Sequence, residues 1–371
     1  MIKKIIITSL IFCGIGIFWF FQDFIKSFFL KSEEIVIEKD FSEEIAKEEQ
    51  GEGLTLSETA LATGNIKKDF KKEENKIVYY NQNNFLETDL EGSFKKTLSS
   101  YPFVNLEKID CLKTGKICLI KADEKYSIYN LETKNIVNLD QKITEVEFNY
   151  LGDGLVYSFF QNNNKYELNT STLEGNNWNL ISEINEENLN FSVNPKKNQV
   201  VYFSRKVDKK KSGIFLTELI SQAQAQKIVE DDIIDVLWSP MGDKLLFSFY
   251  DHSVAPKRVQ LGYYDFIGKK QYKIGLPTIA EKCVWSEDSQ FLYCGVLTSS
   301  ASNEFDFENW EAGSFVSSDL FWKVDLSNNK KERIFNDFKK YPGVDSFNLI
   351  LVEEDLLFID KISGNLIKRE L

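Results

Sequence analysis

Residues 236–247 read VLWSPMGDKLLF, and this stretch decides the fold. Its flanks combine aromatic and aliphatic residues in the alternating manner of half-buried strands. Between the flanks, Pro240 and Gly242 are residue types that favour a tight turn. The stretch therefore predicts two antiparallel strands joined by a short turn.

The same pattern recurs at regular intervals. Residues 146–157 (VEFNYLGDGLVY), 191–202 (FSVNPKKNQVVY) and 283–294 (CVWSEDSQFLYC) align with it without gaps. The anchor position holds Phe148, Val193, Trp238 and Trp285, spaced 45, 45 and 47 residues apart. A second hairpin pattern follows each unit, most clearly at residues 126–138, 261–274, 320–334 and 356–367. Four strands in a unit of about 45 residues are typical of a β-propeller blade.

The count of repeats predicts an all-β propeller of four-stranded antiparallel blades. Seven blades are expected, with starts near Ile66, Val104, Ile143, Leu189, Ile233, Ile279 and Val344. Six blades are the alternative, because the inner strand of the first blade has to come from the Lys-rich segment 66–72. We expect the chain ends to pair and close the ring, since an open edge strand invites aggregation.

One repeat resembles a known family. Residues 238–244 (WSPMGDK), followed by LLF at 245–247, are similar to the W-S-P-D-G-K-x-L-x-F signature of TolB-type, WD-like propeller repeats. Residues 285–289 and 194–198 are weaker copies, and the resemblance covers about residues 77–371. It implies the fold and no particular activity, because propellers of this kind bind very different partners.

The N-terminus predicts a membrane anchor. Residues 5–21 (IIITSLIFCGIGIFWFF) are uncharged and approach the roughly 20 residues that cross a bilayer. Lys3 and Lys4 precede this run, which places the N-terminus in the cytoplasm. The run ends in aromatic residues rather than in the small residues of a cleavage site, so an uncleaved anchor is favoured over a cleaved signal peptide.

Four regions follow from these patterns. We expect a cytoplasmic tail at 1–4, a transmembrane anchor with an interfacial extension at 5–30, an acidic flexible linker at 31–65 and an extracytoplasmic propeller at 66–371. Residues 32–58 contain ten acidic residues and two lysines. Such a segment repels itself, so we interpret it as a solvated spacer, with an acidic docking tail as the alternative.

The composition excludes several classes of function. Acidic residues number 57 against 45 basic ones, a net charge of -12, whereas a surface that binds nucleic acid needs a basic excess. The single histidine, His252, argues against a His-ligated zinc site. We interpret Asp251-His252-Ser253 as a surface loop, because a catalytic triad is assembled in space and no Gly-x-Ser-x-Gly elbow is present. We expect no metal and no cofactor, because the sequence has no calcium loop and no phosphate-binding glycine loop.

Four cysteines of the propeller form two matched pairs. Cys111 and Cys118 flank one hairpin, and Cys283 and Cys294 bracket the equivalent hairpin of a later blade. Directly opposite residues of a hairpin lie close enough for a disulfide. Two disulfides on an extracytoplasmic domain are therefore favoured over four buried free thiols.

Long insertions fall between the second and third strands of three consecutive blades, at residues 205–212, 250–258 and 298–318. The last insertion carries an aromatic cluster with acids, which is typical of a contact surface if it is exposed. The alternative is that the rings fold back and plug the channel or cover a blade edge. Lys209 and Lys210 are read either as a solvated loop tip or as a contact for an anionic polymer. The candidate binding residues are Phe305, Phe307, Trp310, Glu311, Phe315, His252, Lys209 and Lys210.

These observations favour a membrane-anchored propeller that binds a protein or a cell-envelope polymer. The alternative is a glycan-active hydrolase that uses carboxylates at the channel mouth, for which Asp306, Glu308 and Glu311 are candidates. A pair of carboxylates about 5–10 Å apart in a pocket would distinguish the two.

Overall fold

The computed structural model describes residues 59–62, 71–73, 76–92, 95–112, 115–162, 165–186, 188–205, 213–253, 257–298, 302, 305–335 and 344–371. All of them belong to one compact unit, residues 53–371. Within these residues no helix has the length and apolar character needed to cross a membrane. The predicted tail and anchor, and most of the predicted linker, lie outside the described residues.

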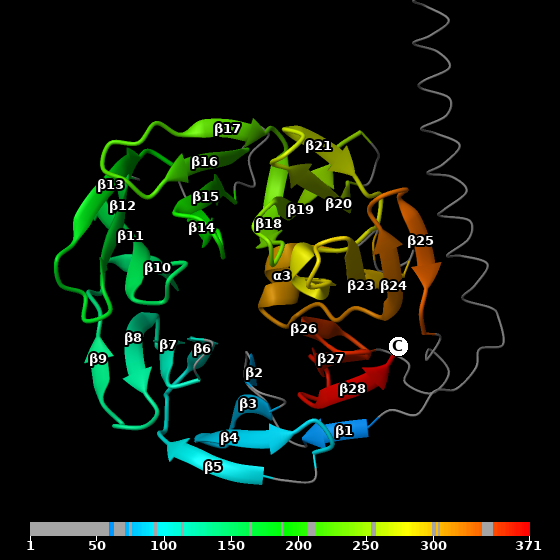
Figure 1. Ribbon diagram of the computed structural model, residues 1–371, viewed down its shortest axis with the longest axis horizontal. Coiled ribbons are helices and arrows are strands. Elements are labelled where there is room, and N and C mark those ends of the chain that lie inside the picture. Colours follow the sequence, from blue (N-terminus) through cyan, green and yellow to red (C-terminus); the bar gives the residue numbers. More distant parts are fainter. Residues whose placement is uncertain are drawn as a thin grey trace, which may run out of the picture. The chain divides into compact units, whose positions relative to one another are not determined.

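Seven four-stranded antiparallel sheets are arranged in a ring (Figure 1). The protein is therefore a seven-bladed β-propeller, and the six-bladed alternative is wrong. In the first three blades the strands are β2 (Lys71–Glu73), β3 (Lys76–Asn81), β4 (Asn84–Asp89) and β5 (Lys95–Ser100), then β6 (Leu106–Cys111), β7 (Ile117–Ala122), β8 (Lys125–Asn130) and β9 (Ile136–Asn138), and then β10 (Ile143–Phe148), β11 (Gly154–Asn162), β12 (Lys165–Thr172) and β13 (Asn179–Ile184).

The next three blades follow the same order along the chain. Their strands are β14 (Leu189–Val193), β15 (Gln199–Ser204), β16 (Ile214–Glu218) and β17 (Gln226–Val229), then β18 (Asp232–Trp238), β19 (Lys244–Asp251), β20 (Arg258–Asp265) and β21 (Lys270–Lys273), and then β22 (Cys283–Trp285), β23 (Phe291–Leu297), β24 (Asp319–Asp325) and β25 (Lys330–Arg333). A short 3-10 helix, η1 (Ala280–Lys282), precedes β22.

Blade seven closes the ring by combining the last three strands of the chain with the first described one. It contains β26 (Ser346–Val352), β27 (Asp355–Asp360) and β28 (Leu366–Glu370), and β1 (Thr59–Ala62) pairs antiparallel with β28. The expected pairing of the chain ends is confirmed. However, β1 lies inside the range predicted as linker, and the inner strand of blade one starts at Lys71 rather than near Ile66. The four-residue segment TALA has too little pattern to predict a strand, and it acquires that conformation by pairing with the edge of β28.

The repeat hairpin shows why the anchor position favours tryptophan. Trp238 pairs with Leu245 across β18 and β19, and its Nε1 donates a hydrogen bond of 3.1 Å to the carbonyl of Ser192 in blade four. Trp285 repeats this contact, with Nε1 donating to the carbonyl of Leu237 at 3.3 Å. Each indole therefore buries a large ring and ties its blade to the preceding one.

Both predicted disulfides are present. Cys111 and Cys118 are partners in the register of β6 and β7, with their Cα atoms 3.9 Å apart. Cys283 and Cys294 are partners in β22 and β23, with their Cα atoms 4.1 Å apart. Each disulfide therefore joins the two inner strands of its blade.

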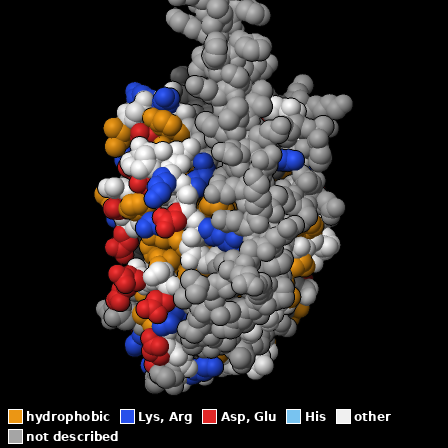
Figure 2. Space-filling view, turned by 90° about the vertical axis from the view of Figure 1, so that its right-hand side faces the viewer, with side chains coloured by type: hydrophobic (Ala, Val, Ile, Leu, Met, Phe, Trp, Pro, Cys, Tyr) orange, Lys and Arg blue, Asp and Glu red, His pale blue; other side chains and the backbone are white. Residues whose placement is uncertain are grey.

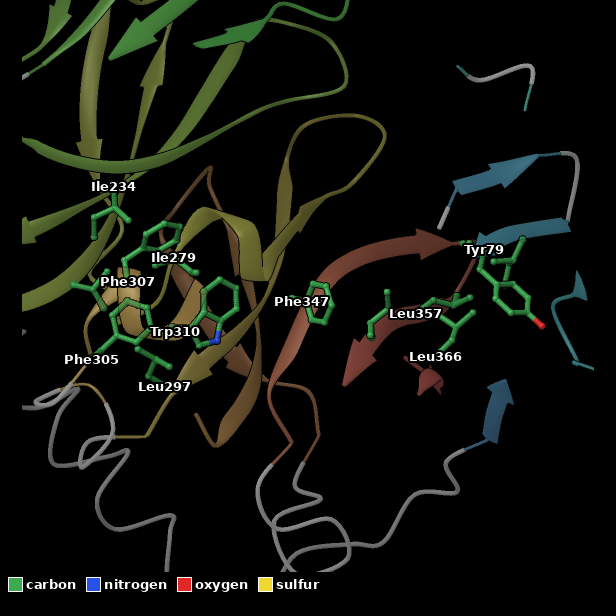
Figure 3. Close-up of a cluster of buried hydrophobic side chains, with 14 residues drawn as sticks. Tyr79, Ile234, Ile279, Leu297, Phe305, Phe307, Trp310, Phe347, Leu357 and Leu366 are labelled. Carbon is green, nitrogen blue, oxygen red and sulfur yellow. The ribbon is translucent and has the colours of Figure 1, made fainter. Parts of the chain in front are cut away.

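The core consists of apolar clusters between neighbouring blades. One cluster reaches from Tyr79 of β3 through blade seven to the blade-six insertion (Figure 3). At the surface, on the described part of the face in Figure 2, acidic and basic side chains are interspersed with apolar ones. The apolar contacts that fix the position of the blade-six insertion lie in the buried cluster, not on the surface.

Candidate functional site

The longest predicted insertion folds into a compact element, which we call the blade-six cap (residues 305–318). Its centre is the short helix α3 (Phe307–Glu311), which lies on the inner side of the ring between β18 and β26 (Figure 1). Asp306 begins the helix, because its carboxylate accepts a hydrogen bond from the backbone N–H of Asn309 at 3.0 Å. Gly313 follows the helix with φ +76°, a conformation that glycine adopts without strain.

The aromatic rings of the cap face inward. Phe305, Phe307 and Trp310 are only 5%, 3% and 2% exposed, and they lie close to Ile279 and Leu297 (Figure 3). The expectation of an exposed aromatic surface is therefore wrong for these three rings, and the folded-back alternative describes them. Their burial in the apolar cluster is energetically favourable, and it holds the cap on the propeller. Phe315 is partly buried against the same cluster.

A buried ionic network lies beneath Trp310. The ammonium of Lys282 in η1 donates to Ser317 Oγ at 2.7 Å, to Asp319 Oδ2 at 2.7 Å and to Asp345 Oδ1 at 2.5 Å. The side chains of Lys282, Asp319 and Asp345 have no solvent-exposed surface. The indole Nε1 of Trp310 donates to both oxygens of Asp345, at 2.9 and 3.1 Å. The network thus joins the cap to blades six and seven.

The electrostatics of the network favour a charged lysine. Burial opposes the charge on Lys282, but Asp319 and Asp345 outweigh this effect and raise its pKa. Burial also opposes the charge on Asp345, but Lys282 and the indole N–H lower its pKa. Burial raises the pKa of Asp319. Buried charges are tolerated only when paired and hydrogen-bonded, as they are in this network.

The two preceding blades also contact the cap. Arg205, directly after β15, lies with its guanidinium 4.6 Å from the ring centre of Phe307 and pairs with Glu311 at 3.6 Å. Tyr250 of β19 accepts a hydrogen bond from the backbone N–H of Phe307 at 3.0 Å. The described ends of the three predicted insertions therefore meet at α3.

The remaining predicted residues are placed separately. Glu311 is exposed, and His252 is exposed with its Nε2 2.8 Å from Asp232 Oδ2. Asp251 accepts a hydrogen bond from the backbone N–H of Ser253, so this carboxylate stabilises the turn. Lys209 and Lys210 lie outside the described residues.

Sequence reasoning missed Lys282 and its partners. The repeat alignment contains a signal that could have found the lysine, because the residue before each hairpin is polar: Glu145, Asn190, Asp235 and Lys282. In blade five, Asp235 accepts hydrogen bonds from the backbone N–H groups of Ala280 and Glu281, at 3.2 and 2.7 Å. Burial is the main reason that the pKa of Asp235 is raised to about 7. Asp235 and Lys282 therefore both link neighbouring segments of different blades through polar contacts.

The surface that remains accessible on the cap is mixed. Glu308, Asn309, Glu311 and Ser314 are exposed, and Val316 is 52% exposed. Among the described residues, no group of three or more potential ligands gathers that could hold a metal ion. The arrangement offers hydrogen-bonding groups and one apolar side chain on a rigid base, which suits a binding surface.

Comparison with known proteins identifies the fold and nothing finer. No family model and no curated protein matches the sequence. An oligogalacturonate lyase in complex with manganese matches in structure at 12% identity and a TM-score of 0.60, covering 86% of this chain and 95% of that chain. The β-propeller domain of the trilobed protease from Pyrococcus furiosus matches at 12% identity and a TM-score of 0.51. The match covers 80% of this chain and 91% of that chain.

A candidate TolB from Agrobacterium tumefaciens also matches, at 11% identity and a TM-score of 0.45, covering 75% of this chain and 94% of that chain. The two preceding matches show a shared β-propeller fold and no particular activity.

Proposed function

We propose that the protein is a membrane-anchored β-propeller on the extracytoplasmic side that binds a protein or cell-envelope polymer through the outer surface of the blade-six cap. The observation that carries this proposal is the construction of the cap. Three buried rings and a buried ionic network fix a short segment whose outer side chains, Glu308 and Val316 among them, face solvent. Binding surfaces on rigid supports lose less conformational entropy on association.

Two observations support the location. The uncharged run at residues 5–21 follows two lysines, as in a membrane anchor whose N-terminus is cytoplasmic. The two disulfides are of the kind that form and persist in an oxidising compartment. A propeller on the outer side of the membrane satisfies both observations.

The contacts of the cap favour binding over hydrolysis. Asp306 begins α3, and Glu311 pairs with Arg205. Asp319 and Asp345 both bind the ammonium of Lys282, but they are fully buried, so a substrate could not reach them. A glycan-active hydrolase needs a pair of carboxylates that reach the substrate. Of the three candidate acids of the cap, Asp306 and Glu311 have structural roles, which leaves the exposed Glu308 as a single carboxylate rather than one of a pair.

The test is site-specific photo-crosslinking with the full-length protein in its native membranes. A photoreactive phenylalanine analogue replaces Val316 on the cap, and the control carries it at Leu151, an exposed residue in the first turn of blade three. We expect a specific adduct at Val316 that is absent at Leu151. Deleting the insertion is a poor test, because it removes three buried rings together with the surface.

A charge reversal confirms the contact once the adduct has been identified. Glu308→Lys changes an exposed side chain and leaves the buried rings intact. We expect it to weaken binding of the purified partner several-fold, because charges at a rim alter association. Identical adducts at both positions, no adduct at Val316, or unchanged binding by Glu308→Lys would each contradict the proposal.

A further inference from the structure

A cavity of about 470 Å³ lies between blades two and three, away from the blade-six cap. This volume is within the range of roughly 300–1,000 Å³ that is usual for small-ligand sites. One wall comes from the middle strands of blade three, and the other comes from the segment that joins β9 to β10.

The register of blade three builds the first wall. Alternate residues of a strand face the same side of its sheet, and facing residues of paired strands are neighbours. The cross-strand pairs that line the cavity are Leu155 with Ser171, Tyr157 with Asn169, and Phe159 with Glu167. The outer strand of blade two, β9, has three residues, whereas β13 has six. We infer that the short β9 leaves the outer part of this wall without a facing strand.

The cavity has an acidic character. Asp140, Glu167 and Glu174 line it, and none of its described lining residues is a lysine or an arginine. The ammonium of Lys142 lies 5.6 Å from the centre of the Phe159 ring, which is part of the lining, so one positive charge stands against three negative ones. Burial, and then the charges of Glu167 and Asp140, raise the pKa of Tyr157. The local potential is therefore negative and attracts cations.

A buried amide in the wall has an unused acceptor. Asn169 is 2% exposed, and its Nδ2 donates to the carbonyl of Glu167 at 3.3 Å. Its Oδ1 receives no hydrogen bond from any residue that the structure describes. Buried polar atoms are normally paired, so the wall of the cavity contains an acceptor that lacks a donor among the described residues. This observation is independent of the acidic residues.

The rim carries an exposed aromatic ring. Trp178, which follows the turn between β12 and β13, is 65% exposed and lines the cavity. An indole face attracts a guanidinium or ammonium group and packs against its aliphatic stem. Gly175 in the same turn lies beside Leu139 of blade two, which positions this turn over the cavity.

We propose that this cavity binds the guanidinium or ammonium group of a basic ligand, with Trp178 against its stem and the carboxylates of Asp140, Glu167 and Glu174 around its charge. A neutral saccharide could stack on the indole, but its binding would gain nothing from the negative charge of the three carboxylates. The net charge of -12 adds a long-range attraction for cations. The basic group belongs either to a residue of a peptide or to a small free cation.

Calorimetric titration of the full-length protein in detergent tests the proposal. The probes are a glycine-flanked arginine peptide, the same peptide with neutral citrulline, free agmatine and the neutral sugar cellotriose. We expect the arginine peptide to bind at least about tenfold more tightly than the citrulline peptide, and more weakly at high salt. Binding of agmatine with equal affinity assigns the site to small cations, and binding of the peptide alone assigns it to a basic segment.

Exposed variants separate recognition from folding. Trp178→Ala should weaken arginine-peptide binding about tenfold, and Glu174→Gln several-fold. The matched controls are Ile267→Ala, in the corresponding turn of blade five, and Glu132→Gln, in blade two, and both should bind like the wild type. The proposal would be overturned if the arginine and citrulline peptides bound equally, if cellotriose alone bound, or if no probe bound. It would also be overturned if Trp178→Ala bound the arginine peptide as tightly as the wild type does.

Discussion

The blade-six cap and the cavity beside blade three contain the same residue types in opposite arrangements. Both combine a tryptophan, other aromatic rings and several acids. In the cap, Trp310 is buried and its indole N–H binds Asp345. In the cavity, Trp178 is exposed and Asn169 retains an unused acceptor. Composition alone therefore cannot distinguish a cluster that stabilises the fold from one that can receive a ligand.

The difference originates in the partners of the acids. Lys282 neutralises the buried carboxylates of Asp319 and Asp345 from within the chain. None of the described residues that line the cavity supplies such a cation. Carboxylates that are neutralised by a lysine of the same chain do not attract a ligand. Carboxylates without such a partner attract a cationic group from outside the chain.

Removal of the internal cation should have the largest effect. Lys282→Met leaves two buried carboxylates without their shared partner, which should cost about 3–5 kcal/mol of the free energy of unfolding. Denaturant unfolding measures this loss. Lys125→Met, at an exposed position in β8, is the control and should change stability by less than about 0.5 kcal/mol. Equal losses for the two variants would show that the network does not stabilise the cap.

A smaller effect is expected for a partly buried acid of blade three. Glu147 accepts a hydrogen bond from the backbone N–H of Val193 at 2.8 Å, and removal of its carboxyl group from water is the main reason that its pKa is raised from 4.5 to about 7. The folded state therefore holds this proton more tightly than the unfolded state. Its stabilising contribution is complete below about pH 4.5 and is lost as the pH rises through about 7.

Glu147→Gln tests this assignment because the amide keeps an acceptor for the N–H of Val193. The free energy of unfolding of the wild type should fall by on the order of 1–2 kcal/mol more than that of the variant between pH 5 and pH 8. Glu183→Gln, at an exposed position in β13, should retain the wild-type pH profile. Parallel profiles for wild type and Glu147→Gln would refute the raised pKa.

The repeat made the architecture predictable. Each indole of Trp238 and Trp285 hydrogen-bonds to the previous blade, so the same residue type is needed at the same place in each blade. The sequence therefore shows it at a regular spacing. The cysteine pairs were predictable for the same reason, since opposite positions in a hairpin follow from its register. Strand β1 was not predictable, because its pairing depends on β28 at the far end of the chain.

The sites were less predictable, because burial depends on contacts between blades. The sequence of the cap offers aromatic rings and acids, but it does not show that Lys282 binds Asp345, 63 residues further along the chain. The cavity depends on the shortness of β9, whose end has no distinct residue pattern. Trp178 stood apart from every recognised motif, so neither its exposure nor its neighbours could be inferred.

The most direct test compares two tryptophans of one molecule. Hydroxyl-radical footprinting of the full-length protein, read by mass spectrometry, measures the oxidation rates of Trp178 and Trp310, which have the same intrinsic reactivity. The account predicts rapid oxidation of Trp178 and strong protection of Trp310, and the arginine peptide should slow oxidation of Trp178 alone. Equal oxidation rates for the two residues without peptide would contradict the contrast between a closed cap and an open cavity.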